Sequence, residues 1–398
     1  MSFSPKKYFS KIYTTELLTE LYKKHGAEAF IEVNDQTPRK TAVNMMMESF
    51  NAIDPEQKID IEKELTFISS FSTENTALLA KKLFKEINGK EFETEIECVS
   101  PHDLILYFFL RHHDLVEDLI FLHEFYLSKN YFKYEAMEYK KENLNASLHE
   151  LKNDWERIAN ENSNATDTEF TSKEIDDILY IRQVYEGSYE RQVKMDKKTG
   201  EVDRAHTVRK IETVRLAYLP KEKLVLVGGN INKQKKLYFM DSFLRIVCKC
   251  GYEGKIESFD VSPFKDLSFN FLNVNKGTPL MKWKIKNITL SYKEGKKKLR
   301  LSLNSDANTL GLDPLSETLE ELGMKNKFES FNIDSLSLSF SFNNEEKENT
   351  MINVSCSISK NKTNLCPLFK YDNYALKLLK LGNINQGFIL EEKKDKKS

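Results

Sequence analysis

The chain has 398 residues, with 60 Lys and Arg against 61 Asp and Glu, and 40% of its residues are hydrophobic. This composition is typical of a globular protein with two domains, and 14 Gly and 9 Pro exclude collagen-like and Pro/Gly-rich disordered classes. No apolar run approaches the length of a membrane span, no apolar signal segment is present, and five scattered Cys fit a reducing compartment, so we expect a cytoplasmic protein.

Residues 1–160 are expected to form an acidic, all-helical bundle. Helix start signals recur at Thr37-Pro38, Asp54-Pro55 and Ser100-Pro101, where an N-cap residue precedes a proline suited to the first turn. Ser100 and Asp103 have the spacing of a capping box. Apolar residues at helical spacing follow these signals and predict core stripes: Ile61, Leu65 and Ile68; Leu79, Leu83 and Ile87; and the continuous run 104–110.

The remaining chain divides into three further parts. Residues 161–172 are polar and lack periodicity, so we interpret them as a linker. Residues 173–390 are expected to form a basic α+β domain, because the apolar period there changes from 3.6 to 2. Residues 391–398 are expected to be a disordered tail.

Three copies of one pattern in the second domain predict three strand-strand-helix units. Each copy has the form Ile-x-x-aliphatic-x-Leu-x-aromatic, beginning at Ile211, Ile285 and Ile333, and is followed by a second strand and a helical segment. We expect the units to join their sheets and to cover one face with helices. In every copy the apolar parity shifts between the Ile and the residue three later, which predicts a bulge or bend.

Charge is distributed unevenly along the chain. Residues 1–165 hold 20 basic and 29 acidic residues, whereas residues 191–300 hold 26 basic and 11 acidic residues. A surface with such a basic excess attracts acidic partners: nucleic acid, an acidic protein, or the acidic half of the same chain. A solvated, Lys-rich surface without a partner is the alternative interpretation.

Basic residues in this segment are interleaved with aromatic residues, which is typical of nucleic-acid-binding surfaces. Lys282, Lys284 and Lys286 alternate along a strand that would present them on an open sheet face. The candidate phosphate-contacting residues are Arg204, Arg209, Lys210, Arg215, Lys233, Lys235, Lys236, Lys282, Lys284, Lys286, Lys296, Lys297, Lys298 and Arg300. Trp283 and Tyr292 are candidates for stacking on bases, provided that they are exposed.

The strong catalytic and nucleotide-binding signatures are absent from the sequence, so we expect no catalytic residue, no metal site and no cofactor. Gly228-Gly229 is better explained by a turn than by phosphate binding. His102, His112, His113 and His123 lie close in the sequence, but no second ligand-bearing helix is evident, and we interpret them as core-edge or surface residues. The thiols of Cys248, Cys250, Cys356 and Cys366 are interpreted as buried and reduced.

The sequence leaves three functional hypotheses. The first is a non-catalytic nucleic-acid-binding or scaffold subunit of a bacterial complex, binding the phosphate backbone of DNA or RNA through a basic sheet or loop surface. The second is a protein-interaction adaptor without nucleic-acid contact, placed in a multi-subunit antiviral defence assembly. The third is a metal-dependent nuclease built on the ExK sequences Glu253-Gly254-Lys255 and Glu294-Gly295-Lys296.

Overall fold

The structure is a computed structural model that describes residues 4–28, 33, 36–137, 143–163, 167–191, 194–195, 202–203, 207–292, 298–303, 310–345 and 350–390. The chain is divided into two compact units. Met1–Leu127 with Glu174–Asp176 form the helical unit, and Ser128–Lys173 with Asp177–Ser398 form the α+β unit. The expected class, a helical bundle followed by a β-rich domain, is confirmed.

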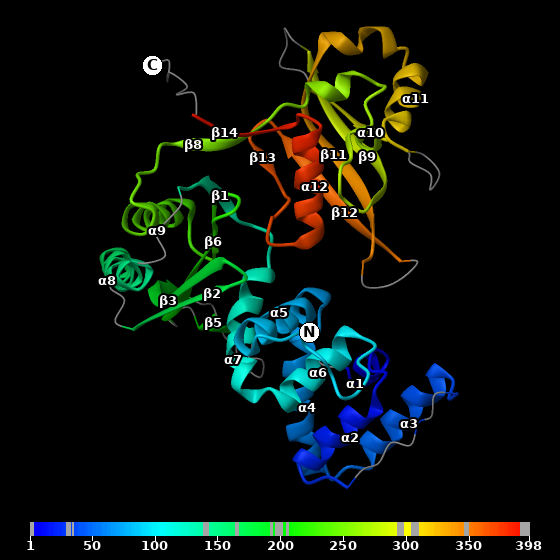
Figure 1. Ribbon diagram of the computed structural model, residues 1–398, viewed down its shortest axis with the longest axis vertical. Helices are drawn as coiled ribbons and strands as arrows, with labels where there is room; N and C mark the ends of the chain where they lie inside the picture. The colour runs from blue at the N-terminus through cyan, green and yellow to red at the C-terminus, as the bar shows by residue number, and fades with distance from the viewer. Residues whose placement is uncertain are drawn as a thin grey trace. The chain divides into compact units, whose positions relative to one another are not determined.

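The helical unit consists of seven α-helices and a short 3-10 helix within its described residues (Figure 1). Their bounds are α1 Pro5–Phe9, α2 Thr15–Lys24, α3 Arg39–Asn51, α4 Pro55–Phe71, α5 Glu74–Asn88, α6 Pro101–Arg111, α7 His113–His123 and η1 Glu124–Tyr126. The expected stripe residues of α4 are buried, and the run 104–110 in α6 is buried on all sides. In the expected stripe of α5, Leu79 and Leu83 are buried, whereas half of the surface of Ile87 is exposed.

The capping box at the start of α6 is confirmed and extends beyond the helix. Ser100 accepts a hydrogen bond from the Asp103 backbone N–H at 3.0 Å, and Asp103 accepts from the Ser100 backbone N–H at 3.0 Å. The other carboxylate oxygen of Asp103 accepts the backbone N–H groups of Tyr13 and Thr14 at 2.9 and 3.1 Å. Asp103 is fully buried and therefore holds the chain before α2 against the start of α6.

The boundary between the units lies earlier than the sequence indicates. The chain enters the α+β unit at Ser128, and strand β1 (Phe132–Glu135) and helix α8 (Leu144–Ser163) belong to it. The expected linker at 161–172 coincides with the end of α8 and with the start of strand β2 (Thr168–Ile175). The polar composition was misleading because β2 leaves most of its side chains partly exposed. The expected tail at 391–398 lies outside the described residues.

The first sheet of the α+β unit has the strand order β1-β7-β6-β3-β2. Its further strands are β3 Ile178–Arg191, β6 Thr207–Leu219 and β7 Leu224–Gly229, and helix α9 spans Lys233–Ile246. A core that includes Trp155, Tyr218 and Phe239 lies between this sheet and the helices α8 and α9. A separate two-stranded ribbon pairs β4 (Lys194–Met195) with β5 (Val202–Asp203).

The second sheet has the strand order β10-β9-β11-β12-β13 and carries its helices on one face (Figure 1). Its strands are β9 Leu280–Tyr292, β10 Lys298–Ser302, β11 Phe331–Asn343, β12 Met351–Ser359 and β13 Lys362–Thr363. The core beneath it is closed by η3 Ser262–Lys265, α10 Phe271–Val274, α11 Asp313–Glu321, η4 Lys325–Ser330 and α12 Lys370–Leu381. A ribbon of β8 (Lys255–Phe259) and β14 (Asn385–Leu390) completes the unit.

The three predicted strand-strand-helix units are present as β6-β7-α9, β9-β10-α11 and β11-β12-α12. Only the last two join in one sheet, through the antiparallel pairing of β9 with β11. The first unit instead pairs with β3 in the other sheet, so the expectation of a single joined sheet is wrong. The second strand of the first unit already pairs with β1, which lies within residues 1–160, the region expected to be all helical.

The predicted bulges occur in two of the three units. In β9 the register shifts at Lys286, and in β11 it shifts at Asp334, each within the interval that the parity change indicated. In β6 the pairing with β3 runs without a shift from Ile211 to Val214, because Ile211 is exposed and does not have to reach the core. Among the described residues, no helix combines the length and apolar character needed to cross a bilayer.

We expect Asp103→Ala to lower the free energy of unfolding of the helical unit by about 3 kcal/mol. The substitution removes a helix cap and leaves the backbone N–H groups of Tyr13 and Thr14 without their acceptor. Urea denaturation followed by far-UV circular dichroism measures the effect. Asp114→Ala, at an exposed position in the first turn of α7, is the control; equal losses in both variants would contradict the role of Asp103.

We expect Gly229→Ala to destabilise the α+β unit by about 3 kcal/mol, since strain and overpacking add. Gly229 has φ +119°, and a Cβ there would lie 2.0 Å from the Thr213 carbonyl oxygen. Thermal denaturation measures the loss. Gly251→Ala is the control, because a Cβ at Gly251 would have no neighbour within 4 Å. A Gly229→Ala variant as stable as wild type would show that the close approach of β6 and β7 is not required.

Candidate functional site

The open face of the second sheet is lined with small polar side chains, because β11 and β12 alternate strictly between apolar residues and serine. Leu336, Leu338 and Phe340 of β11 are buried against the helices. The residues between them project to the opposite face, since neighbouring side chains of a strand point to opposite sides. The positions on this face of the two strands are Ser335, Ser337, Ser339, Ser341, Asn353, Ser355, Ser357 and Ser359; of these, Ser339 and Ser341 are buried, and the others are partly or fully exposed.

Antiparallel pairing aligns these residues into rows across the sheet. Ser337 lies opposite Ser357 on one side and Asn287 on the other, and Ser335 lies opposite Ser359 and Thr289. The same rows continue to β10, where Arg300 lies opposite Thr289. The sheet therefore presents hydroxyl and amide groups in its centre, with cationic side chains toward its edges.

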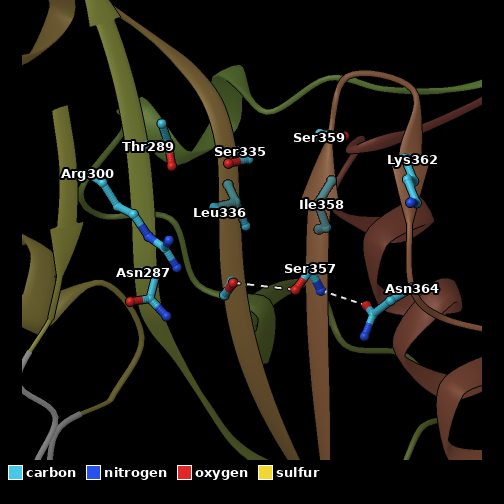
Figure 2. A pocket seen from close by; sticks show the side chains of 11 residues that line it. Asn287, Thr289, Arg300, Ser335, Leu336, Ser357, Ile358, Ser359, Lys362 and Asn364 are labelled. Atoms are coloured by element: carbon cyan, nitrogen blue, oxygen red, sulfur yellow. Dashed lines mark hydrogen bonds between the residues drawn. The ribbon is translucent and has the colours of Figure 1, made fainter. Parts of the chain in front are cut away.

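A shallow hollow of about 450 Å³ lies over these rows. Figure 2 shows Arg300 and Lys362 on opposite sides of the serine side chains. The lining residues come from five strands and the turn after β13: Asn287, Thr289, Arg300, Ser335, Leu336, Ser337, Ser357, Ile358, Ser359, Lys362 and Asn364. The lining thus contains two cations, several hydroxyl and amide groups, and no carboxylate.

Hydrogen bonds fix the floor of the hollow. The hydroxyl oxygens of Ser337 and Ser357 lie 3.4 Å apart (Figure 2). Asn364 accepts a hydrogen bond from the Ser357 backbone N–H at 2.7 Å and donates to the Ser355 carbonyl at 3.1 Å. The Ser302 hydroxyl donates to Asn287 at 2.9 Å. Because Asn364 bonds only backbone groups of β12 here, the Ser357 hydroxyl keeps hydrogen-bonding capacity for a ligand.

The two cations of the hollow are exposed, and neither forms an ion pair within the described part of the chain. Lys298, on the same strand as Arg300, instead pairs with Asp334 at 2.9 Å. The ion pair with Lys298, together with a hydrogen bond from Ser291, holds the pKa of the Asp334 carboxyl below its usual value. The rim of the hollow therefore contains one neutralised acid, and Arg300 and Lys362 give the hollow a positive potential.

The structure brings five of the predicted residues together at this face: Lys282, Lys284, Lys286, Lys298 and Arg300. Lys282 and Lys284 lie opposite Ser341 and Ser339, which places them on the open side of β9. The bulge at Lys286 keeps both this residue and Asn287 partly exposed while Ile285 and Ile288 remain buried. The open face of the sheet thus has a row of cations along β9 and β10.

The other described basic candidates lie on the first sheet and on α9, away from this row. Arg209 pairs with Glu186 at 2.7 Å, and Lys235 pairs with Glu212 at 2.5 Å. Lys236 is buried, and desolvation lowers its pKa. Lys210, Arg215 and Lys233 also belong to β6 and α9. The predicted basic residues therefore form two separate groups, one on the second sheet and one on the first sheet and its helix α9. Arg204, Lys296 and Lys297 lie outside the described residues.

The stacking role expected for Trp283 is wrong, because only 1% of its surface is exposed. Its ring packs against Phe271 with centroids 4.8 Å apart, and its indole N–H donates to Asn270 at 2.8 Å. Trp283 alternates with the lysines of β9 and therefore points into the core. Tyr292 is 53% exposed, at the end of β9, with its ring 4.4 Å from Phe331.

Lys362, Asn364 and the serines of this face were not among the site residues predicted from the sequence. A signal was present, since β11 and β12 place serine at every second position of long alternating strands. Serine and asparagine carry no charge and belong to no catalytic motif here, so patterns of charge and of catalytic residues do not indicate them. Lys362 lies outside the basic segment 191–300 and reaches the site only because β13 pairs with the end of β12.

The described residues show no arrangement of side chains that supports a metal site or a metal-dependent nuclease. Among the described residues, no three or more His, Cys, Asp or Glu side chains are arranged to hold a metal ion. His112 separates α6 from α7, so the histidines do not share one helix, and burial lowers the pKa of His102 to about 4. Burial raises the pKa of the Cys356 thiol to about 12. Lys255 pairs with Glu135 and Glu253, and the second ExK sequence lies outside the described residues.

Comparison with models of known protein families, with curated proteins and with solved structures finds no match to this chain.

Proposed function

We propose that the protein is a non-catalytic nucleic-acid-binding subunit, which binds the phosphate backbone on the open face of its second sheet. The main support for this proposal is that Arg300 and Lys362 flank a polar hollow whose lining has no carboxylate. Cations without ion-pair partners attract polyanions, and hydroxyl and amide groups donate hydrogen bonds to phosphate oxygens. The five unpaired cysteines support a reducing, cytoplasmic location.

The row of lysines on β9 extends the same surface beyond the hollow. Lys282 and Lys286 are partly exposed and form no ion pair in the described residues. A nucleic acid that follows β9 would therefore meet several cations in succession. Such contacts give affinity through charge, without reading the base sequence.

An acidic protein segment is the second occupant that fits the charge of this face. Carboxylates accept the same hydrogen bonds from Arg and Lys as phosphates do. A competition experiment separates the two classes.

The first test is a titration of fluorescent DNA and RNA, single-stranded and duplex, with the full chain at several salt concentrations. We expect binding that weakens steeply as salt rises, because bound cations displace counterions from the phosphates. The double variant Arg300→Glu/Lys362→Glu is expected to lose at least about tenfold in affinity and to lower the salt slope by about 2.

Lys380→Glu is the single-site control, because Lys380 is exposed on α12, which packs on the other face of the sheet. Its affinity is expected to stay close to that of wild type. No binding of any nucleic acid at low salt would overturn the proposal. Binding of polyglutamate alone would indicate the adaptor, and Mg²⁺-dependent cleavage of the probes would indicate the nuclease.

The second test removes the acid at the rim. We expect Asp334→Asn to increase affinity for nucleic acid several-fold at low salt, because Lys298 then loses its paired carboxylate. Asparagine can still accept the hydrogen bond from Ser291, so the fold at the bulge is retained. Fluorescence anisotropy at low and high salt measures the change. Unchanged affinity at low salt would show that the nucleic acid does not approach Lys298.

A further inference from the structure

The open face of the second sheet has a layered distribution of chemistry that is more specific than a basic patch. One border is cationic and consists of Lys282, Lys284, Lys286 and Arg300 on β9 and β10. The centre, on β11 and β12, carries hydroxyl and amide groups, and the carboxylate of Asp334 on β11 is paired with Lys298. Lys362 on β13 provides the cation of the opposite border. Two charged borders with a neutral centre fit a ligand with two separated lines of negative charge.

The separation of the borders can be derived from the strand order. Arg300 on β10 and Lys362 on β13 are four strand positions apart in the order β10-β9-β11-β12-β13. Neighbouring strands lie about 4.8 Å apart, so the two backbones are roughly 19 Å apart. The side chains between them are short, whereas those of the borders are long. A single strand of nucleic acid presents one line of phosphates, but a duplex presents two lines with a groove between them.

The lining of the hollow holds no aromatic side chain. Proteins that bind single-stranded nucleic acid or splayed RNA loops stack bases on exposed aromatic rings. Trp283, the tryptophan of β9, points into the core instead. Within the described residues the lining of the hollow therefore offers no stacking platform, and the exposed Tyr292 is not part of that lining, which favours a duplex whose bases remain paired.

The neutral centre fits one type of groove. Serine hydroxyls and asparagine amides both donate and accept hydrogen bonds, as does the ribose 2′-hydroxyl. The minor groove of A-form RNA is wide and shallow and displays these hydroxyls between its two phosphate lines. The minor groove of B-form DNA is narrower, about 6 Å wide, and lacks the 2′-hydroxyl. Ser357 lies between Arg300 and Lys362 in Figure 2, and Ser337 lies opposite it in the pairing of β11 with β12, so both hydroxyls are where such 2′-hydroxyls would be placed.

We propose that the open face of the second sheet binds the minor-groove side of double-stranded RNA. Arg300 and Lys362 contact phosphates of opposite strands, and Ser337 and Ser357 bond 2′-hydroxyl groups between them. This inference rests on the proposed function, because it requires that the face binds nucleic acid, and it adds the class of nucleic acid.

The experiment compares four fluorescent probes of one sequence with the full chain at the same series of salt concentrations: duplex RNA, duplex DNA, single-stranded RNA, and duplex RNA methylated at its 2′-oxygens. We expect duplex RNA to bind at least about tenfold more tightly than duplex DNA and single-stranded RNA. Methylation removes the donor of the 2′-hydroxyl and adds bulk, and should abolish most of the preference.

Two sets of variants separate the centre from the borders. Ser337→Ala/Ser357→Ala is expected to reduce the preference for duplex RNA over duplex DNA while leaving the salt slope unchanged. Arg300→Gln/Lys362→Gln should weaken both duplexes equally and lower the slope by about 2. Ser316→Ala, on α11 at the helical side of the sheet, is the serine control and should retain wild-type binding. Thermal denaturation checks that every variant is folded.

The two proposals fail in different ways. Equal binding of all four probes, or tighter binding of single-stranded RNA, would overturn the duplex-RNA assignment and leave the phosphate-binding function standing. A preference for duplex RNA that the serine variant does not alter would also overturn the assignment of the hydroxyl groups. No binding of any probe would overturn both.

Discussion

The two-residue period of a β-strand is the constraint on which the site depends. In β11, leucine and phenylalanine alternate with serine, so one face packs against α11 and α12 and the other remains polar. A shift of the register by one residue would bury the serines and expose the apolar side chains, which makes the register strongly specified. The same physical preference that builds the core therefore also assembles the polar face.

Bulges let the long strands satisfy two requirements at once. At Lys286 and Asp334 one strand carries an extra residue, and the apolar side chains on both sides of it still reach the core. In β9 the extra residue is a lysine that adds a cation to the open face, and in β11 it is an aspartate that pairs with Lys298. The chain thus changes its alternation without losing contact between the sheet and its helices, and at these two of the three register shifts the extra residue is a charged side chain at the polar surface.

Local patterns predicted those parts of the fold that depend on neighbouring residues. The cap of α6, the strand-strand-helix units and two bulges follow from spacing alone, because each is determined within a few residues of sequence. Which strands pair with each other could not be predicted in this way. The pairing of β1 with β7 depends on contacts about 90 residues apart, and the pairing of β6 with β3, which puts the first unit into its own sheet, depends on a strand outside the repeated pattern, so neither is encoded by that local pattern. Trp283 shows the limit within one strand: its alternation with Lys282 and Lys284 indicated a buried ring, yet its chemistry suggested a binding role.

Asn364, which follows β13, limits the addition of strands from other chains in concentrated solution. An outer strand with unoccupied N–H and C=O groups is a template on which another chain can add its own strand, and this is a common route to aggregation. The side-chain amide of Asn364 occupies the Ser357 N–H and the Ser355 C=O on that outer side of β12. Asn230 makes the equivalent pair of bonds with Thr213 and Ile211 of β6. In both sheets a single amide therefore blocks intermolecular strand addition at these positions.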